Sequence, residues 1–196
     1  MGWIRKLYDW VLSWAETPYG AAALVVLAFA EASFFPIPPD VLLIALCLGS
    51  PKRWWRFAGL CTAASVAGGA AGYLIGWGLW AAVDQFFFTY VPGFTEEVFQ
   101  RVAEKYEAWN FWVVFIAAFT PIPFKVFTIA AGVCGIHFPM FLIAAMVGRG
   151  TRFTAVSLLL RIFGEPIRGF IDRWFNLLTI VFVILLIGSF FLLKYF

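Results

Sequence analysis

The sequence predicts an all-α integral membrane protein, and three observations lead to that fold class. Of the 196 residues, 63% are hydrophobic, against about 45–50% in soluble domains. The apolar residues form long runs, with most charged residues between them. A proline-rich break also recurs in two of the runs. We therefore expect one membrane domain over 1–196, built as an inverted repeat with two re-entrant hairpins, about three full transmembrane helices and an N-terminal interfacial helix.

Residues 1–18 are expected to form the interfacial amphipathic helix. Trp3, Leu7, Val11 and Trp14 recur at helical spacing, with charged and polar residues between them, which favours a position at the membrane surface. Packing of this helix on the protein itself is the alternative. The net charge of +3 is small and spread along the chain, so we expect anionic lipid headgroups, and not nucleic acid, beside the basic residues.

Four apolar runs follow, at 19–50, 57–83, 109–160 and 174–193. The second and fourth suit single spans, because about 20 residues cross a hydrocarbon core. The first is too long for one upright helix and too short for two spans with a turn, and Pro36, Pro38 and Pro39 interrupt it. Proline removes a backbone donor and ends a helix. We expect a hairpin that breaks at depth and returns to the same side; a kinked or tilted span is the alternative.

The break recurs in the second half of the chain. An alignment without gaps sets Phe35-Pro36-Ile37-Pro38-Pro39-Asp40-Val41 against Thr120-Pro121-Ile122-Pro123-Phe124-Lys125-Val126. A long apolar span follows each motif, at 57–83 and at 138–160. Broken segments at matching positions of two halves are the sequence pattern that indicates a transporter binding site.

The domain is therefore divided into a first repeat at 19–83, a connector at 84–108, a second repeat at 109–160 and a C-terminal part at 161–196 with an interfacial segment and a last transmembrane helix. If both hairpins are re-entrant, one side of the membrane holds Arg5, Lys6, Lys52, Arg53, Arg56, Arg161, Arg168 and Arg173, and the other holds Arg101, Lys105 and Lys194. The bias is weaker if each hairpin is a single span. The positive-inside rule thus favours the re-entrant topology with a cytoplasmic N-terminus.

The connector 84–108 is expected to contain a short amphipathic helix on the outer face. Thr95 before Glu96 and Glu97 is a favourable helix start. Glu97 and Arg101 have the spacing of a helical ion pair. We expect this helix to be structural.

A glycine stripe lies in the run at 57–83. Gly68, Gly72 and Gly76 recur every fourth residue and form a smooth groove that another helix can approach closely. We expect internal packing there; the interface of a homo-oligomer is the alternative.

Five charged residues lie inside the apolar runs: Glu31, Asp40, Lys125, Arg149 and Arg152. Charges at membrane depth are costly, face protein or water, and mark functional sites. Asp40 and Lys125 occupy equivalent positions, so an acidic hairpin tip is expected to face a basic one. The cations, together with the helix starts at the breaks, would bind a phosphate-bearing headgroup, and a buried carboxylate can carry a proton. A buried ionic network that only stabilises the fold is the alternative.

The residues that carry enzyme chemistry are sparse. Cys47, Cys61 and Cys134 are isolated in apolar stretches, and His137 is the single histidine. Metal sites need clustered ligands, and no Ser, His and acid group lies together in the sequence. We therefore expect no metal, no cofactor and no catalytic residue.

The combination of motifs resembles a known family. It consists of Glu31-Ala32-Ser33-Phe34-Phe35-Pro36-Ile37-Pro38-Pro39-Asp40, Phe119-Thr120-Pro121-Ile122-Pro123-Phe124-Lys125 and Gly148-Arg149. This pattern is similar to the DedA family, also called the SNARE-associated Golgi protein or VTT-domain family, and most of all to its YqaA-like branch. The resemblance implies opposed re-entrant hairpins, a place in the bacterial inner membrane, and movement of phospholipid or undecaprenyl phosphate between leaflets, in some members linked to the proton gradient.

The same resemblance implies roles for individual residues. The family's acidic pair maps by position to Glu31 and Asp40, and its later arginine to Arg149 or Arg152. Many members carry an arginine where Ala118 stands and another near Lys125; lysine keeps the charge but lacks the bidentate grip of arginine.

The sequence as a whole leads us to expect a lipid transporter or scramblase that moves a phosphate-containing lipid, with protons as a second partner if transport is coupled. The five membrane charges equally suit a proton- or cation-coupled transporter of small solutes. A structural membrane-assembly factor is the third hypothesis.

Overall fold

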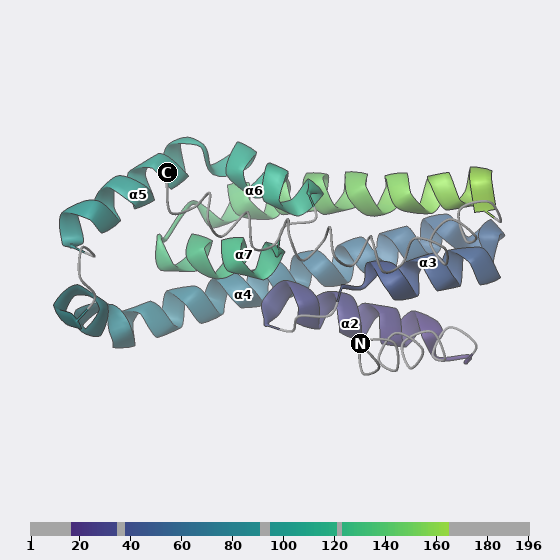
Figure 1. Ribbon diagram of the computed structural model, residues 1–196, viewed down its shortest axis with the longest axis horizontal. Coiled ribbons are helices and arrows are strands. Elements are labelled where there is room, and N and C mark those ends of the chain that lie inside the picture. The colour runs from purple at the N-terminus through teal and green to yellow at the C-terminus, as the bar shows by residue number, and fades with distance from the viewer. Residues whose placement is uncertain (1–16, 35–37, 91–94, 121–122, 165–196) are drawn as a thin grey trace, which may run out of the picture.

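The computed structural model describes residues 17–34, 38–90, 95–120 and 123–164 (Figure 1). Within these ranges the protein is built from helices and contains no strand, which confirms the predicted all-α class. The span expected at 174–193 lies outside the described residues, as do all but the last two residues of the helix expected at 1–18.

The first half contains a broken helix pair followed by one long helix. The pair consists of α2 (Gly20–Ser33) and α3 (Asp40–Gly49); a short 3-10 turn, η1 (Pro51–Arg53), then leads into α4 (Trp54–Tyr90). Figure 1 shows that α3 runs back in the direction from which α2 came. Pro39 directly precedes α3, with Pro38 before it, and Pro36 lies outside the described residues. The helix ends and restarts where the sequence predicts a break.

The second half repeats this arrangement. After α5 (Glu96–Ala108) come α6 (Asn110–Phe119) and α7 (Phe124–Val133), which again run in opposite directions, and then a helix over Phe138–Gly164 (Figure 1). Pro123 directly precedes α7, while Pro121 lies outside the described residues. Gly135, with a φ of 62°, allows the sharp turn between α7 and the last described helix.

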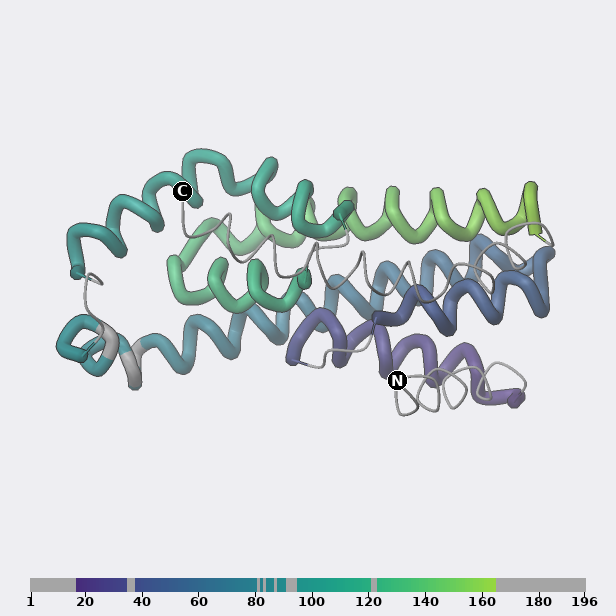
Figure 2. The backbone as a smooth tube through the Cα atoms, in the orientation of Figure 1, coloured from purple at the N-terminus to yellow at the C-terminus, as the bar shows by residue number. Residues whose placement is uncertain are grey.

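The two hairpins enter from opposite ends of the molecule. In Figure 2, α4 and the Phe138–Gly164 helix extend along the long axis, and the breaks of both hairpins lie near its middle. Helix α4 packs against α2 and α7, one from each half. The breaks are therefore brought together by the same long helix.

The glycine stripe of α4 makes this close packing feasible. A Cβ atom at Gly68 would meet the backbone of Phe29 in α2, and one at Gly76 would meet the backbone of Ile129 in α7. Between them, Gly72 lies against Thr128 of α7. The stripe contacts both hairpins, so the prediction of internal packing is confirmed, and this surface is not free for an oligomer interface.

Two of the described helices are long and apolar enough to cross a membrane: Pro51–Trp80, with 30 residues, and Phe138–Gly164, with 27. At a rise of about 1.5 Å per residue they extend over roughly 40–45 Å. The four hairpin helices have 14 residues in α2 and 10 each in α3, α6 and α7. These four helices are too short to cross a hydrocarbon core of about 30 Å.

Helix α4 continues farther than the sequence pattern predicts. The apolar run ends near residue 83, but the helix continues to Tyr90. After Gly78 the next helix-breaking residue is Pro92, so nothing in the polar stretch stops the helix earlier. The connector therefore begins as an extension of α4.

The predicted connector helix is confirmed as α5. The Thr95 hydroxyl oxygen accepts a hydrogen bond from the Val98 backbone N–H at 3.3 Å, as expected of an N-cap. Glu97 and Arg101 form an exposed ion pair at 3.9 Å.

Aromatic contacts attach α5 to the two halves. The ring of Phe99 stacks on Trp80 of α4 with a centroid distance of 4.7 Å. The Tyr106 hydroxyl donates to the carbonyl oxygen of Phe127 in α7 at 2.9 Å. Burial raises the pKa of Tyr106 well above its usual value, so the hydroxyl keeps its proton and stays a donor. These contacts support the structural role expected for this helix.

Candidate functional site

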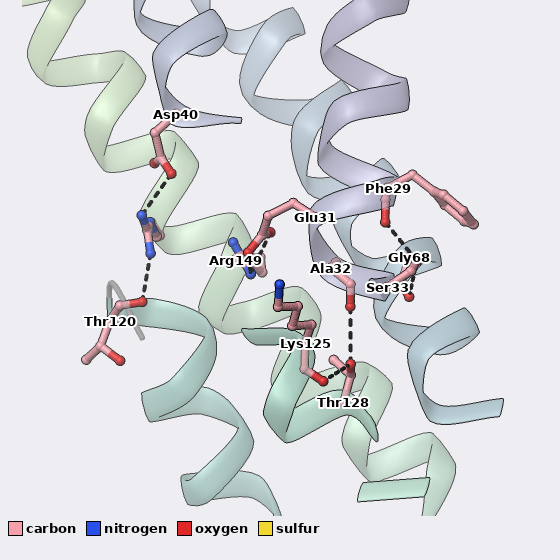
Figure 3. Close-up of polar contacts among 11 residues, drawn as sticks. Phe29, Glu31, Ala32, Ser33, Asp40, Gly68, Thr120, Lys125, Thr128 and Arg149 are labelled. Atoms are coloured by element: carbon pink, nitrogen blue, oxygen red, sulfur yellow. Dashed lines mark hydrogen bonds and ion pairs between the residues drawn. The ribbon is translucent and has the colours of Figure 1, made fainter. Parts of the chain in front are cut away.

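The charged residues predicted from the sequence converge on the hairpin breaks. Glu31 lies near the end of α2, Asp40 is the first residue of α3, and Lys125 is the second residue of α7. Arg149 and Arg152 are three residues apart in the Phe138–Gly164 helix and so share one face. Figure 3 shows the carboxylates of the first half opposite cations of the second half.

The innermost contact is the ion pair between Glu31 and Arg149. The Arg149 Nη2 atom lies 3.1 Å from Oε2 and 3.4 Å from Oε1 of Glu31. The two side chains are only 14% and 3% exposed, respectively. The guanidinium also lies over the ring of Phe124, 4.4 Å from its centroid, and 5.6 Å from that of Phe153, so aromatic rings support it.

The second ion pair joins both breaks. The Arg152 Nη2 atom lies 2.9 Å from Oδ2 of Asp40, with side chains 18% and 20% exposed. The Nη1 atom of the same arginine, Arg152, donates to the carbonyl oxygen of Thr120 at 2.7 Å. Thr120 follows the last residue of α6, where helix carbonyls lack intrahelical partners. One guanidinium therefore holds the start of α3 and the end of α6 together.

Lys125 differs from the other four charges. Within the described residues its ammonium has no hydrogen bond and no ion pair, although the side chain is half-buried. The sequence leads us to expect the acidic tip at Asp40 to face the basic tip at Lys125; the ion pair of Asp40 is made with Arg152. In Figure 3 the Lys125 side chain extends from the start of α7 in the direction of the Glu31–Arg149 pair.

The described part of the cluster is therefore positively charged. Three cations stand against two carboxylates, and both carboxylates are engaged by arginines. No acidic residue lies in the first turn of α7, where free backbone N–H groups favour an anion. The Nε atom of Arg149 is buried and has no partner within the described residues. The arrangement suits an anionic ligand.

A threonine that the sequence pattern did not single out connects the two hairpins. The Thr128 hydroxyl lies 3.1 Å from the carbonyl oxygen of Ala32 and 3.0 Å from that of Lys125. The usual helical donor to Ala32 would be residue 36, a proline without an N–H group. Thr128 thus satisfies a carbonyl at the break of the other hairpin. Because Pro36 lies four residues after Ala32, the sequence shows that the Ala32 carbonyl lacks its helical donor. It does not show which residue donates to that carbonyl instead.

The remaining residues considered in the sequence lie apart from this cluster or have no partner in it. Arg161 is exposed near the end of the last described helix, and the His137 side chain is exposed while its backbone N–H donates to a Glu107 carboxylate oxygen at 2.9 Å. Cys47 and Cys61 are buried free thiols. Within the described ranges, no group of three or more His, Cys, Asp or Glu residues has the arrangement of a metal site.

Fold and site together define a helical protein in which two broken hairpins from different halves are joined by buried ion pairs. The chain is 34% identical over 197 residues to an uncharacterized protein of Haemophilus influenzae, covering 96% of both chains. It is 36% identical over 152 residues to the uncharacterized protein HI0703 homolog of Histophilus somni, covering 77% of this chain and 78% of that one. The chain belongs to the same family as these two proteins. No family model and no solved structure matches it.

Proposed function

We propose that this is an integral membrane protein that moves a phosphate-bearing lipid between the leaflets of the bilayer. The membrane setting rests first on the tryptophans of the Pro51–Trp80 helix. Trp55 and Trp77 are both exposed, and their separation of 22 positions corresponds to about 33 Å of helix. That separation suits aromatic anchoring at the two surfaces of a hydrocarbon core of about 30 Å.

Exposed apolar side chains support the same setting. On the Phe138–Gly164 helix, Ile143, Met146, Leu159 and Ile162 all have exposed side chains. Apolar surface of this extent is unusual on a monomeric soluble protein and is expected where lipid tails are the solvent.

The two hairpins are proposed to be re-entrant and related as an inverted repeat. Each arm is too short to cross the bilayer, and the hairpins enter from opposite ends of the molecule (Figure 1). Broken backbone at membrane depth requires partners inside the protein, and Thr128 and Arg152 supply them for carbonyls of Ala32 and Thr120. With the basic bias predicted from the sequence, this topology gives a cytoplasmic N-terminus, and the DedA resemblance favours the bacterial inner membrane.

The observation that carries the proposal is the positive charge of Lys125, which no anion among the described residues matches. Buried ion pairs alone suit a structural lock equally well, because each pair is neutral. A half-buried ammonium without an anion beside it has no such explanation in the described residues. It disfavours a small cation as the ligand and favours an anion, whose phosphate oxygens would accept hydrogen bonds from lysine and from the start of α7.

Apolar residues at the breaks favour a lipid over a free anion. Phe34 follows α2 and Phe119 ends α6, at equivalent positions of the two repeats. Both are exposed, at 64% and 46%. Exposed aromatic rings beside a charged site suit a ligand with a phosphate headgroup and hydrocarbon tails. The DedA resemblance leads to the same class of substrate, and Glu31 or Asp40 would carry the proton if transport is coupled.

The proposal is tested with Lys125→Gln in reconstituted vesicles. The vesicles contain a phosphatidylglycerol with a fluorescent tail, and dithionite added outside destroys the dye in the outer leaflet only. We expect wild-type protein to expose the inner-leaflet lipid and Lys125→Gln to slow this about ten-fold or more, as for loss of a charged contact. Arg161→Gln, an exposed cation outside the cluster, is the control and should retain the wild-type rate.

Within the described residues Lys125 has no ion-pair partner that Lys125→Gln would leave unpaired, so we expect the unfolding temperature of this variant to match wild type. A Lys125→Gln variant that moves lipid at the wild-type rate contradicts the proposal. The proton- or cation-coupled solute transporter, favoured by the carboxylates of Glu31 and Asp40, predicts instead a proton or cation flux without lipid movement. The same vesicles measure that flux when loaded with a pH-sensitive dye.

A further inference from the structure

The two ion pairs of the cluster differ in how firmly they are held. The Arg149 Nη2 atom lies within 3.4 Å of both carboxylate oxygens of Glu31, and its guanidinium lies over two aromatic rings. Among the described residues, Arg152 meets Asp40 through a single hydrogen bond, from Nη2 to Oδ2 at 2.9 Å. The side chains of Arg152 and Asp40 are 18% and 20% exposed, whereas that of Arg149 is 3% exposed. The second pair is therefore the one that a ligand can reach.

The positions of the two carboxylates in their helices differ in the same sense. Glu31 lies in the last turn of α2, where the helix dipole favours a cation, so its charge depends on Arg149. Asp40 is the first residue of α3, where the dipole favours an anion. Before it stands Pro39, whose side chain has no acceptor, so the first backbone N–H groups of α3 lack a side-chain cap. Asp40 therefore remains stabilised by its own helix when it leaves Arg152.

We propose that Asp40 occupies the phosphate site of Arg152 in the ligand-free protein, and that the phosphate group of the ligand displaces it. A guanidinium binds carboxylate and phosphate oxygens in the same way, through charge-assisted N–H···O bonds. The Nη2 atom changes partner from Asp40 to the ligand, while Nη1 keeps the carbonyl oxygen of Thr120. The inference rests on the proposed function and deepens it, because it names the arginine that takes the phosphate.

The exchange has consequences for affinity and for the clamp between the hairpins. Arg152 is available to the ligand only when Asp40 has left, so the carboxylate lowers the apparent affinity by the fraction of protein in which the pair is open. Arg152 joins the start of α3 to the end of α6 while Asp40 is its partner. A phosphate in place of Asp40 releases α3 from this clamp and leaves α6 attached.

Binding to the full-length protein in detergent micelles tests the exchange. The probes are dioctanoyl phosphatidate, inorganic phosphate, and dioctanoylglycerol, which has the same tails and no phosphate. The test variant is Asp40→Asn, which removes the competing charge and keeps the size of the side chain. The matched control is Asp40→Glu, which keeps a carboxylate. Asp40→Asn is also combined with Arg152→Gln, which removes the proposed site.

We expect Asp40→Asn to bind phosphatidate about ten-fold more tightly than wild type, as for loss of one competing hydrogen bond between charged groups. Asp40→Glu should stay within about three-fold of wild type. In the Arg152→Gln background, Asp40→Asn should change the affinity less than about two-fold, because no guanidinium is left to be released. A purely structural ion pair predicts another result, since Asp40→Asn would then loosen the site and leave the affinity unchanged or weaker.

A second measurement uses the wild-type protein without any substitution. A carboxyl-modifying reagent, followed by peptide mass spectrometry, should label Asp40 faster when phosphatidate is bound, because the carboxylate has left Arg152. Glu31, whose pair is almost enclosed, should keep its labelling rate. Labelling of Asp40 that does not rise with phosphatidate contradicts the displacement.

The outcomes separate this inference from the proposed function. Tighter binding of both phosphate probes to Asp40→Asn, dependent on Arg152, supports the exchange. If only inorganic phosphate binds and shows this gain, the exchange stands and a lipid substrate is contradicted. An equal gain in the Arg152→Gln background overturns the exchange, because the carboxylate then acts through its long-range charge alone. Unchanged or weaker binding to Asp40→Asn overturns it too, whatever the effect of Lys125→Gln on lipid movement. The same gain for dioctanoylglycerol, bound as tightly as phosphatidate, overturns it as well.

Discussion

Removal of Arg149 should destabilise the protein much more than removal of the whole Glu31–Arg149 pair. The pair is 3.1 Å apart and almost enclosed. At an effective dielectric constant of about 20, two unit charges at that distance attract by about 5 kcal/mol. Arg149→Met leaves the Glu31 carboxylate buried without its partner, and such a loss costs about 3–5 kcal/mol. Glu31→Gln should cost a similar amount, because it leaves the more deeply buried guanidinium without its counter-charge.

The double variant Glu31→Gln/Arg149→Met leaves no unpaired charge behind. Its free energy of unfolding should lie within about 1–2 kcal/mol of wild type, because an apolar or neutral replacement of a buried ion pair is often tolerated. The coupling free energy between the two sites should therefore be at least about 3 kcal/mol. Equilibrium unfolding in mixed micelles with an increasing fraction of dodecyl sulfate, followed by tryptophan fluorescence, measures all four proteins.

Additive losses in the double variant would refute this reasoning, since they would mean that the two charges do not act on each other. The same variant also separates stability from transport. If the double variant folds but no longer moves lipid, the Glu31–Arg149 pair has a role in transport. If it moves lipid at the wild-type rate, the pair has a structural role only.

Two further predictions concern the contacts between the hairpins and α4. Gly76→Val should lower the free energy of unfolding by about 3 kcal/mol or more, because its side chain would meet the backbone of Ile129. The control Gly78→Val has open space around it and should cost less than about 1 kcal/mol. Equal losses for the two variants in the same unfolding assay would contradict the packing. Thr128→Val should lower the free energy of unfolding by about 1–2 kcal/mol, because the Ala32 carbonyl loses its donor. Thr128→Ser keeps the hydroxyl and should keep most of that stability. A serine variant as unstable as the valine variant would argue against the hydrogen bond.

The positions of the hairpin breaks and the charged residues of the site could be predicted from the sequence, because both depend on the chemistry of single residues. Proline lacks an N–H group wherever it stands, so the ends of α2 and α6 follow from the motifs alone. A charge within an apolar run is costly in any fold. These rules identified all four residues of the two ion pairs.

The partners within the site could not be predicted, because they depend on how helices are rotated and where they end. Equivalence in the repeat suggested that the tips at Asp40 and Lys125 face each other, but Asp40 forms its ion pair with Arg152 of the Phe138–Gly164 helix. Thr128 is an ordinary small polar residue in an apolar helix. Only the close packing along the glycine stripe of α4 places it against Ala32, at the break of the other hairpin.

The central claim is that Lys125, an ammonium with no anion beside it among the described residues, lets a phosphate-bearing lipid cross the bilayer. The most direct measurement compares two fluorescent lipids with identical tails in vesicles containing the protein, one a phosphatidate and the other a diacylglycerol glucoside without phosphate. We measure the rate at which each becomes accessible from outside, relative to protein-free vesicles. The account predicts faster movement of the phosphatidate, and loss of that preference in Lys125→Gln. Equal acceleration of both lipids, or of neither, contradicts it.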